Sequence, residues 1–156
     1  MSAPESSLPK QTVPKIEDTN NVQVEDIRRM LFDTRPRDYA VTSDFLFSDA
    51  EIMDAIRRAN EEFNSLPPTT LRVDLRGIPD QMCLKYGACY HACLTKAFTY
   101  GNMQVKYASG GTTVDMYGPQ IEAYTRAADR FHALFKELAL SIKRQINMRR
   151  AYGTLY

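Results

Sequence analysis

Apolar and polar positions follow their most regular pattern in the last quarter of the chain. From Pro119 to about Arg150, apolar side chains recur at alternating steps of three and four residues, at Ile121, Tyr124, Ala128, Phe131, Phe135, Leu138 and Ile142. This period predicts one long helix with a single packed seam, roughly 45 Å long at ~1.5 Å rise per residue. The seam turns polar at Gln145 and Arg149. We therefore expect a core helix to about Ile142, followed by a projecting basic and aromatic end.

Three shorter helices are predicted before the long one. The first spans about Val22 to Phe32 and ends before Asp33-Thr34-Arg35-Pro36. The second begins at a capping box, Ser48-Asp49-Ala50-Glu51, and runs to about Asn64, where Leu66-Pro67-Pro68 stops it. The third runs from Asp80 to about Tyr100. Its small residues Gly87, Ala88 and Ala92 permit close approach of another helix, and Gly101-Asn102 predicts a left-handed exit.

Strict alternation appears between the third helix and the last. The alternating positions Met103, Val105 and Tyr107, and then Thr112, Val114 and Met116, predict two strands joined by Ala108-Ser109-Gly110-Gly111. A lone hairpin is marginal in water, so it must lie against helices or pair its edges with neighbouring chains. The Leu71, Val73, Leu75 alternation is either a short strand or an extended segment that docks three apolar side chains.

These elements predict a mainly α fold, a small helical bundle with a long C-terminal helix and one β-hairpin inserted before it. A chain of 156 residues is one typical domain. Residues 1–21, with Pro4, Pro9 and Pro14, read as an extended N-terminal arm. Residues 22–150 form the helical domain, with the hairpin at 103–116, and residues 151–156 form a tail because Gly153 breaks the helix.

Composition and charge narrow the classes of function. A net charge of +1 argues against a strongly basic nucleic-acid binder, although the charge is uneven. Residues 1–66 carry thirteen acids against eight bases, and residues 119–156 carry seven bases against three acids. The final group, Lys143, Arg144, Arg149 and Arg150, suits head-to-tail contacts between copies or an acidic partner, or simply a solvated helix end. No stretch predicts a membrane span or a secretory signal, and three cysteines suggest a reducing compartment.

Candidate catalytic and metal residues do not form a convincing site in the sequence. Cys83, Cys89, His91 and Cys93 do not converge on a helix, so we expect buried thiols rather than zinc ligands. A Cys–His dyad with His91 or His132 is not favoured, and the acids and arginines of the 33–44 loop are expected to form ion pairs. Ser109-Gly110-Gly111-Thr112-Thr113 reads as a hairpin turn rather than a phosphate cradle. We expect no enzyme activity, no cofactor and no metal.

The order of these features resembles the head-to-tail connector proteins of tailed bacteriophages, also called adaptor, neck or head-completion proteins. The resemblance covers roughly residues 40–150 and rests on four stretches in order. These are the capped helix FSDAEIMDAIRRANEEFNSLPP, the KYGACYHACLTKAF helix, the YASGGTTVDMYG segment with its SGG-x-x-VD pattern, and the long amphipathic C-terminal helix. The N-terminal arm is not part of the resemblance.

The resemblance implies a structural virion protein that forms a homo-oligomeric ring, commonly of twelve copies, between the portal and the tail. Such a ring lies in the virion neck, is assembled in the host cytoplasm, and lines the DNA exit channel, where non-specific DNA contact is expected. The C-terminal segment would dock on the portal, and the opposite side would receive a tail-side neck or tail terminator protein. The implied docking candidates are Lys143, Arg144, Arg149, Arg150, Tyr152, Leu155 and Tyr156. Hairpin residues 103–116 would contact neighbouring subunits or the tail side.

One alternative stays open at this point. Arg149, Arg150, Tyr152 and Tyr156 combine basic and aromatic side chains, which suits contacts with phosphates and bases. The same residue types dominate protein interfaces. The alternative to a connector is therefore a helical regulatory or nucleic-acid-binding module that uses its basic C-terminal end.

Overall fold

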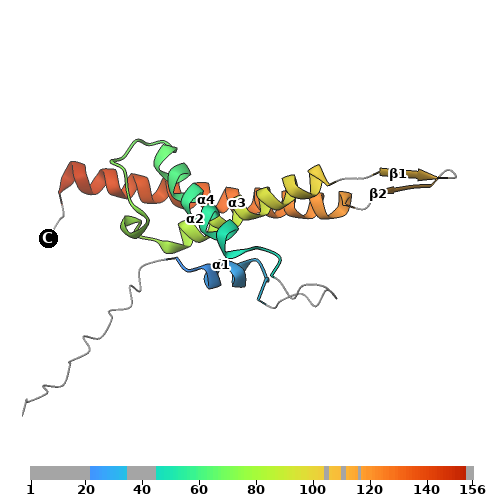
Figure 1. Cartoon of the computed structure of the whole chain (residues 1–156). Helices are drawn as coiled ribbons and strands as arrows, with labels where there is room; N and C mark the ends of the chain where they lie inside the picture. The colour runs from blue at the N-terminus through green and yellow to red at the C-terminus, as the bar shows by residue number, and fades with distance from the viewer. Residues whose placement is uncertain (1–21, 35–44, 104–105, 110–111, 116, 154–156) are drawn as a thin grey trace, which may run out of the picture.

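The computed structural model describes residues 22–34, 45–103, 106–109, 112–115 and 117–153 and confirms a mainly helical chain. The helices in these residues are α1 (Val24–Met30), α2 (Asp49–Ser65), α3 (Gln81–Asn102) and α4 (Gly118–Tyr152), with a short 3₁₀ helix η1 (Leu75–Gly77). Two strands, β1 (Lys106–Ser109) and β2 (Thr112–Asp115), precede α4. Antiparallel α3 and α4 lie side by side, α2 crosses them, and α1 lies along one edge (Figure 1).

The long seam of α4 packs largely as its periodicity predicts. The 35 residues of this helix span roughly 50 Å at ~1.5 Å per residue. Ala128, Phe135 and Ile142 are buried in the core, and Tyr124, Phe131 and Leu138 are partly buried against it. Lys143 is the last fully buried residue of α4, and Ile146 is still partly buried against the core. Full burial therefore ends close to Ile142, where the sequence predicts the end of the core helix.

Close approach of three helices occurs at Gly87, as the small residues of α3 predict. A Cβ atom at this position would lie 2.8 Å from the Cβ of Ala59 on α2 and 3.0 Å from the ring of Phe135 on α4. Ala88 and Ala92 are buried on the same helix. The core therefore forms where α2, α3 and α4 meet.

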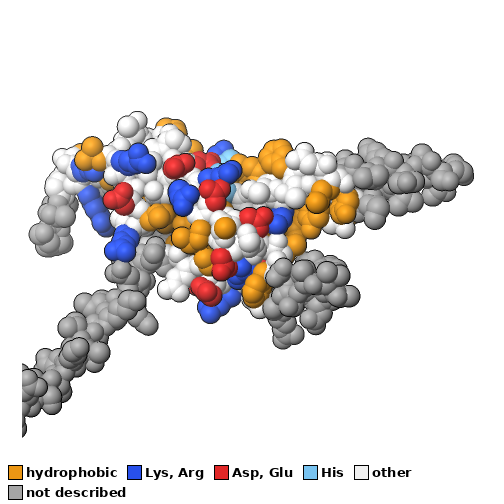
Figure 2. All heavy atoms as spheres, in the orientation of Figure 1, with side chains coloured by type: hydrophobic (Ala, Val, Ile, Leu, Met, Phe, Trp, Pro, Cys, Tyr) orange, Lys and Arg blue, Asp and Glu red, His pale blue; other side chains and the backbone are white. Residues whose placement is uncertain are grey.

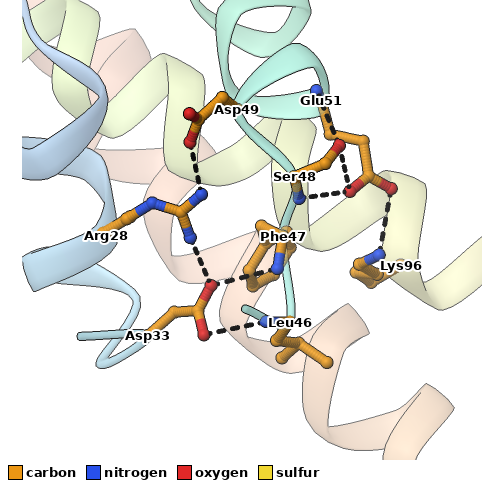
Figure 3. Close-up of polar contacts among 8 residues, drawn as sticks. All are labelled: Arg28, Asp33, Leu46, Phe47, Ser48, Asp49, Glu51 and Lys96. Atoms are coloured by element: carbon orange, nitrogen blue, oxygen red, sulfur yellow. Dashed lines mark hydrogen bonds and ion pairs between the residues drawn. The ribbon is translucent and has the colours of Figure 1, made fainter. Parts of the chain in front are cut away.

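The start of α2 is fixed by the predicted capping box. Ser48 Oγ accepts a hydrogen bond from Glu51 N at 3.2 Å, and Ser48 N donates to Glu51 Oε2 at 2.8 Å. Lys96 of α3 binds the other carboxylate oxygen, Oε1, at 2.9 Å (Figure 3). Burial raises the pKa of Glu51, but the hydrogen bonds from Ser48 and Lys96 outweigh it and leave the pKa below its usual value. The box therefore caps α2 and ties it to α3.

The predicted exit from α3 is wrong. Gly101 and Asn102 lie within α3, and Met103 ends the helix in a right-handed conformation because its N–H binds the carbonyls of Thr99 and Tyr100. No left-handed exit is needed.

The Leu71–Leu75 stretch forms no strand. The Asn64 side chain accepts a hydrogen bond from the N–H of Val73 and donates one to its C=O. These are the groups that would otherwise pair with a neighbouring strand. Val73 and Leu75 pack partly against the core, whereas Leu71 is exposed. Of the three predicted docking side chains, only two dock.

Strands β1 and β2 pair antiparallel, with Lys106 opposite Asp115 and Ser109 opposite Thr112. They lie beyond the adjoining ends of α3 and α4, away from the helical body (Figure 1). Both strands are shorter than the 103–116 range of the prediction, and residues 104–105, 110–111 and 116 lie outside the described residues. Within the described part of the chain, no helix is both long enough and apolar enough to cross a membrane.

Candidate protein interface

The C-terminal end of α4 is where the basic residues singled out in the sequence come together. Arg144, Arg149 and Arg150 are exposed, and within the described residues none of them forms an ion pair. Tyr152 is 76% exposed, and Gly153 ends the helix with a positive φ of 71°. Figure 2 shows Lys and Arg side chains gathered at this end of the molecule. Leu155 and Tyr156 lie outside the described residues.

Lys143 does not belong to this exposed group, and its assignment as a docking residue is wrong. Its side chain is fully buried, and Nζ donates to the carbonyl oxygens of Asn64, at 3.3 Å, and Leu66. The ammonium group also lies 5.3 Å from the centre of the Phe63 ring. Lys143 therefore caps the C-terminal end of α2, where unpaired carbonyls carry partial negative charge. Burial lowers its pKa from the usual value of 10.5.

A shallow recess borders the exposed basic end. It lies between the turn that follows α2 and the last turns of α4, and its volume is about 510 Å³. Its lining residues are Pro67, Pro68, Leu140, Arg144, Asn147 and Met148. Asn147 Nδ2 donates to Thr69 O at 3.3 Å, which holds the turn against the helix. The recess is apolar with one cation at its edge.

Sequence reasoning missed the apolar half of this surface. Leu140, Arg144 and Met148 are spaced by four residues on α4, so they share one face that is distinct from the core seam. Leu140 and Met148 are exposed large apolar residues. The signal in the sequence is a second series of positions spaced by one helical turn, Leu140, Arg144 and Met148, which runs beside the apolar seam of α4.

Among the hairpin candidates, Met103 lies at the end of α3 and is exposed. Tyr107 and Val114 are partners in the strand register, and Thr112 is the partner of Ser109. Val105 and Met116 lie outside the described residues. The structure therefore separates the basic end and the hairpin, which lie at opposite ends of the molecule (Figure 1).

The two histidines, distant in sequence, meet at one carboxylate. Glu62 of α2 lies 3.0 Å from His91 Nε2 of α3 and 2.8 Å from His132 Nε2 of α4. His132 also stacks on Tyr90, with ring centroids 4.1 Å apart. The His91 nitrogen is buried and lacks the alignment of a hydrogen bond. Burial lowers the pKa of His91 despite the nearby Glu62 carboxylate.

The three cysteines are buried, as expected for thiols that pack as small apolar groups. Burial raises the pKa of Cys83 and of Cys89 to about 12 and that of Cys93 to about 11. These thiols are therefore neutral at physiological pH and unreactive. Among the described residues, no group of three or more His, Cys, Asp or Glu side chains is arranged to hold a metal ion.

Asp33 alone of the loop acids and arginines lies within the described residues, and it forms an ion pair with Arg28 of α1 rather than with an arginine of the loop.

Comparisons of this chain with protein-family models, curated proteins and solved structures give no match.

Proposed function

We propose that this protein is a ring-forming subunit of a head-to-tail connector, which joins a portal to a tail and lines the DNA exit channel. The observation that carries the proposal is the free end of α4. After the last buried residue, Lys143, the helix continues to Tyr152 with exposed arginines, an exposed tyrosine and a neighbouring apolar recess. Arginine and tyrosine beside an apolar recess are the composition of a protein docking surface.

A second feature of the shape supports an assembled role. The basic end and the two-stranded sheet lie at opposite ends of the molecule (Figure 1). A sheet of two short strands is marginal in water, and its two outer edges are open to pairing with other chains. A subunit with one attachment surface at each end suits a position between two partners.

The test combines the full chain with the cognate portal ring and observes the complex by negative-stain microscopy and native mass spectrometry. We expect a ring of copies on one face of the portal. The double variant Arg149→Glu/Arg150→Glu should lose it, because both arginines are exposed at the proposed contact. The matched control Arg29→Glu/Lys136→Glu changes the charge equally at exposed positions elsewhere and should retain the ring. A wild-type chain that stays monomeric and ignores the portal would refute the proposal.

The same variants separate a connector from a nucleic-acid-binding module. If the basic end binds DNA, affinity for a duplex should fall steeply with salt and should be lost in Arg149→Glu/Arg150→Glu. Such binding in the absence of portal binding would favour the alternative.

A further inference from the structure

The side of α4 that faces away from the core carries a stripe of apolar and small residues, which we call the outer stripe. Leu134 is 42% exposed and Leu140 is 37% exposed. Ala133 is exposed as well, and a small residue at this point allows another helix to approach closely. Toward the start of the helix the same side is hollowed by a recess of about 560 Å³ that is lined by α4 residues. The outer stripe therefore has the character of a helix-packing surface.

Two opposite charges lie on the outer stripe, and both are unpaired. Arg130 and Glu137 are exposed and stand seven residues apart, which is about two helical turns or roughly 10 Å. They share one side of the helix with Leu134 between them, but they are too far apart to pair with each other. Within the described part of the chain, neither side chain forms an ion pair or a hydrogen bond. The stripe thus offers one free cation and one free anion to a partner.

We infer that the outer stripe of α4 binds the outer stripe of a second copy, with the two helices antiparallel. A pair centred between Ala133 and Leu134 sets Arg130 of each copy opposite Glu137 of the other, so both free charges are paired across the contact. The two Leu134 side chains meet near the twofold axis, where the small Ala133 leaves room for them. The surface is its own complement, which is the property that selects a second copy as the partner.

The charge pattern also selects the direction of the helices. A parallel pair in register would set Arg130 opposite Arg130 and Glu137 opposite Glu137, and like charges in contact are unfavourable. In the antiparallel pair, the neighbouring cation Arg126 lies opposite the uncharged Ser141. The antiparallel arrangement is therefore the one in which opposite charges face each other.

A second antiparallel register would pair Glu137 with Arg144 instead of Arg130. Arg144 is also exposed and lies about two turns beyond Glu137. That register would set Leu134 opposite Asn147, whose side chain is already bonded to a backbone carbonyl of its own chain. It would also leave the hollow part of the stripe uncovered. The register with Arg130 buries more apolar surface, so we expect that one.

This contact concerns the free protein and does not rest on the connector proposal. A ring repeats a contact between two different surfaces, whereas the outer stripe joins a surface to its own copy and stops at two chains. One pair of helices makes a small interface. We therefore expect a dimer that dissociates at concentrations of about 1–100 µM.

The test exchanges the two charges and measures dimerisation of the full chain by sedimentation equilibrium over that range. Arg130→Glu leaves two acids on the stripe and Glu137→Arg leaves two cations, so each variant alone should dimerise at least about tenfold more weakly than the wild type. An equimolar mixture of the two variants should restore dimerisation, because each acid of one chain then meets an arginine of the other. A fluorescent label on one variant identifies the restored species as the heterodimer.

The matched controls are Asp129→Arg and Lys136→Glu. Both positions are exposed and each lies one residue from a tested position, which turns it off the outer stripe. Each control should dimerise as the wild type does. A wild-type chain that is monomeric throughout the range overturns the inference, and so does a mixture that dimerises no better than the single variants. Loss of the dimer in Arg144→Glu but not in Arg130→Glu also overturns it, since the other register then holds.

The outcome is distinguishable from that of the connector proposal. Portal rings formed by a chain that is monomeric on its own would remove the outer-stripe contact and leave the connector standing. A dimer that obeys the charge exchange but ignores the portal would do the reverse.

Discussion

Gly87 is the position where one added methyl group tests the packing of the whole core. The Gly87→Ala variant places a Cβ atom 2.8 Å from the Cβ of Ala59 and 3.0 Å from two ring atoms of Phe135. Carbon atoms make their best contacts at about 3.5–4.0 Å, so both neighbours are too close. Ala59 is attached directly to the α2 backbone and cannot rotate away. The helices must therefore move apart or the Phe135 ring must leave its preferred position.

Two opposing effects set the size of the change. Overpacking a close-packed core costs about 1–3 kcal/mol. Replacing Gly by Ala inside a helix contributes about 1 kcal/mol of stability in the other direction. We expect Gly87→Ala to lower the free energy of unfolding by about 1 kcal/mol, which for a chain of this length lowers Tm by about 2–4 °C.

Urea unfolding followed by circular dichroism measures this change. Gly101→Ala is the matched control, because Gly101 lies in the same helix and a Cβ there meets nothing within 4 Å. The control should be unchanged or slightly stabilised. The double variant Ala59→Gly/Gly87→Ala should be more stable than the sum of its single changes indicates, since it relieves the closer contact. Stabilisation by Gly87→Ala equal to that of Gly101→Ala would refute the close packing of these helices.

Three further predictions concern single residues. Lys143→Met should lower the free energy of unfolding by about 2 kcal/mol, because it leaves buried carbonyls at the end of α2 unpaired. The control is Lys136→Met at an exposed position, which should change the free energy of unfolding by less than about 0.5 kcal/mol in the same urea titration. Burial lowers the pKa of His91 below its usual value of 6.5, so the unfolded chain binds a proton at this histidine more readily than the folded chain. The free energy of unfolding should therefore fall as the pH drops below about 6.5. Urea unfolding from pH 5 to 8 measures this dependence, and His91→Gln should flatten it. Phe32, just after α1, has a left-handed backbone with a φ of 56°. Phe32→Gly should relieve this strain and raise the free energy of unfolding by about 0.5 kcal/mol in the same urea titration, whereas Phe32→Ala should not. A destabilised Phe32→Gly variant would contradict the strain.

The features that the sequence predicts correctly are those that depend on neighbours along the chain. The capping box of α2 needs only Ser48 and Glu51, and the seam of α4 needs only its own periodicity. The small side of α3 is also local, although which helices approach Gly87 is not. Such patterns define the helices because their cause lies within a few turns.

The features that the sequence does not predict depend on where separate elements meet. Lys143 follows directly after the seam residue Ile142 and looks like the start of the basic end, but α2 ends beside it and provides carbonyls. Glu62, His91 and His132 come together only because three helices cross at one place. Nothing in the spacing of these residues along the chain indicates that crossing.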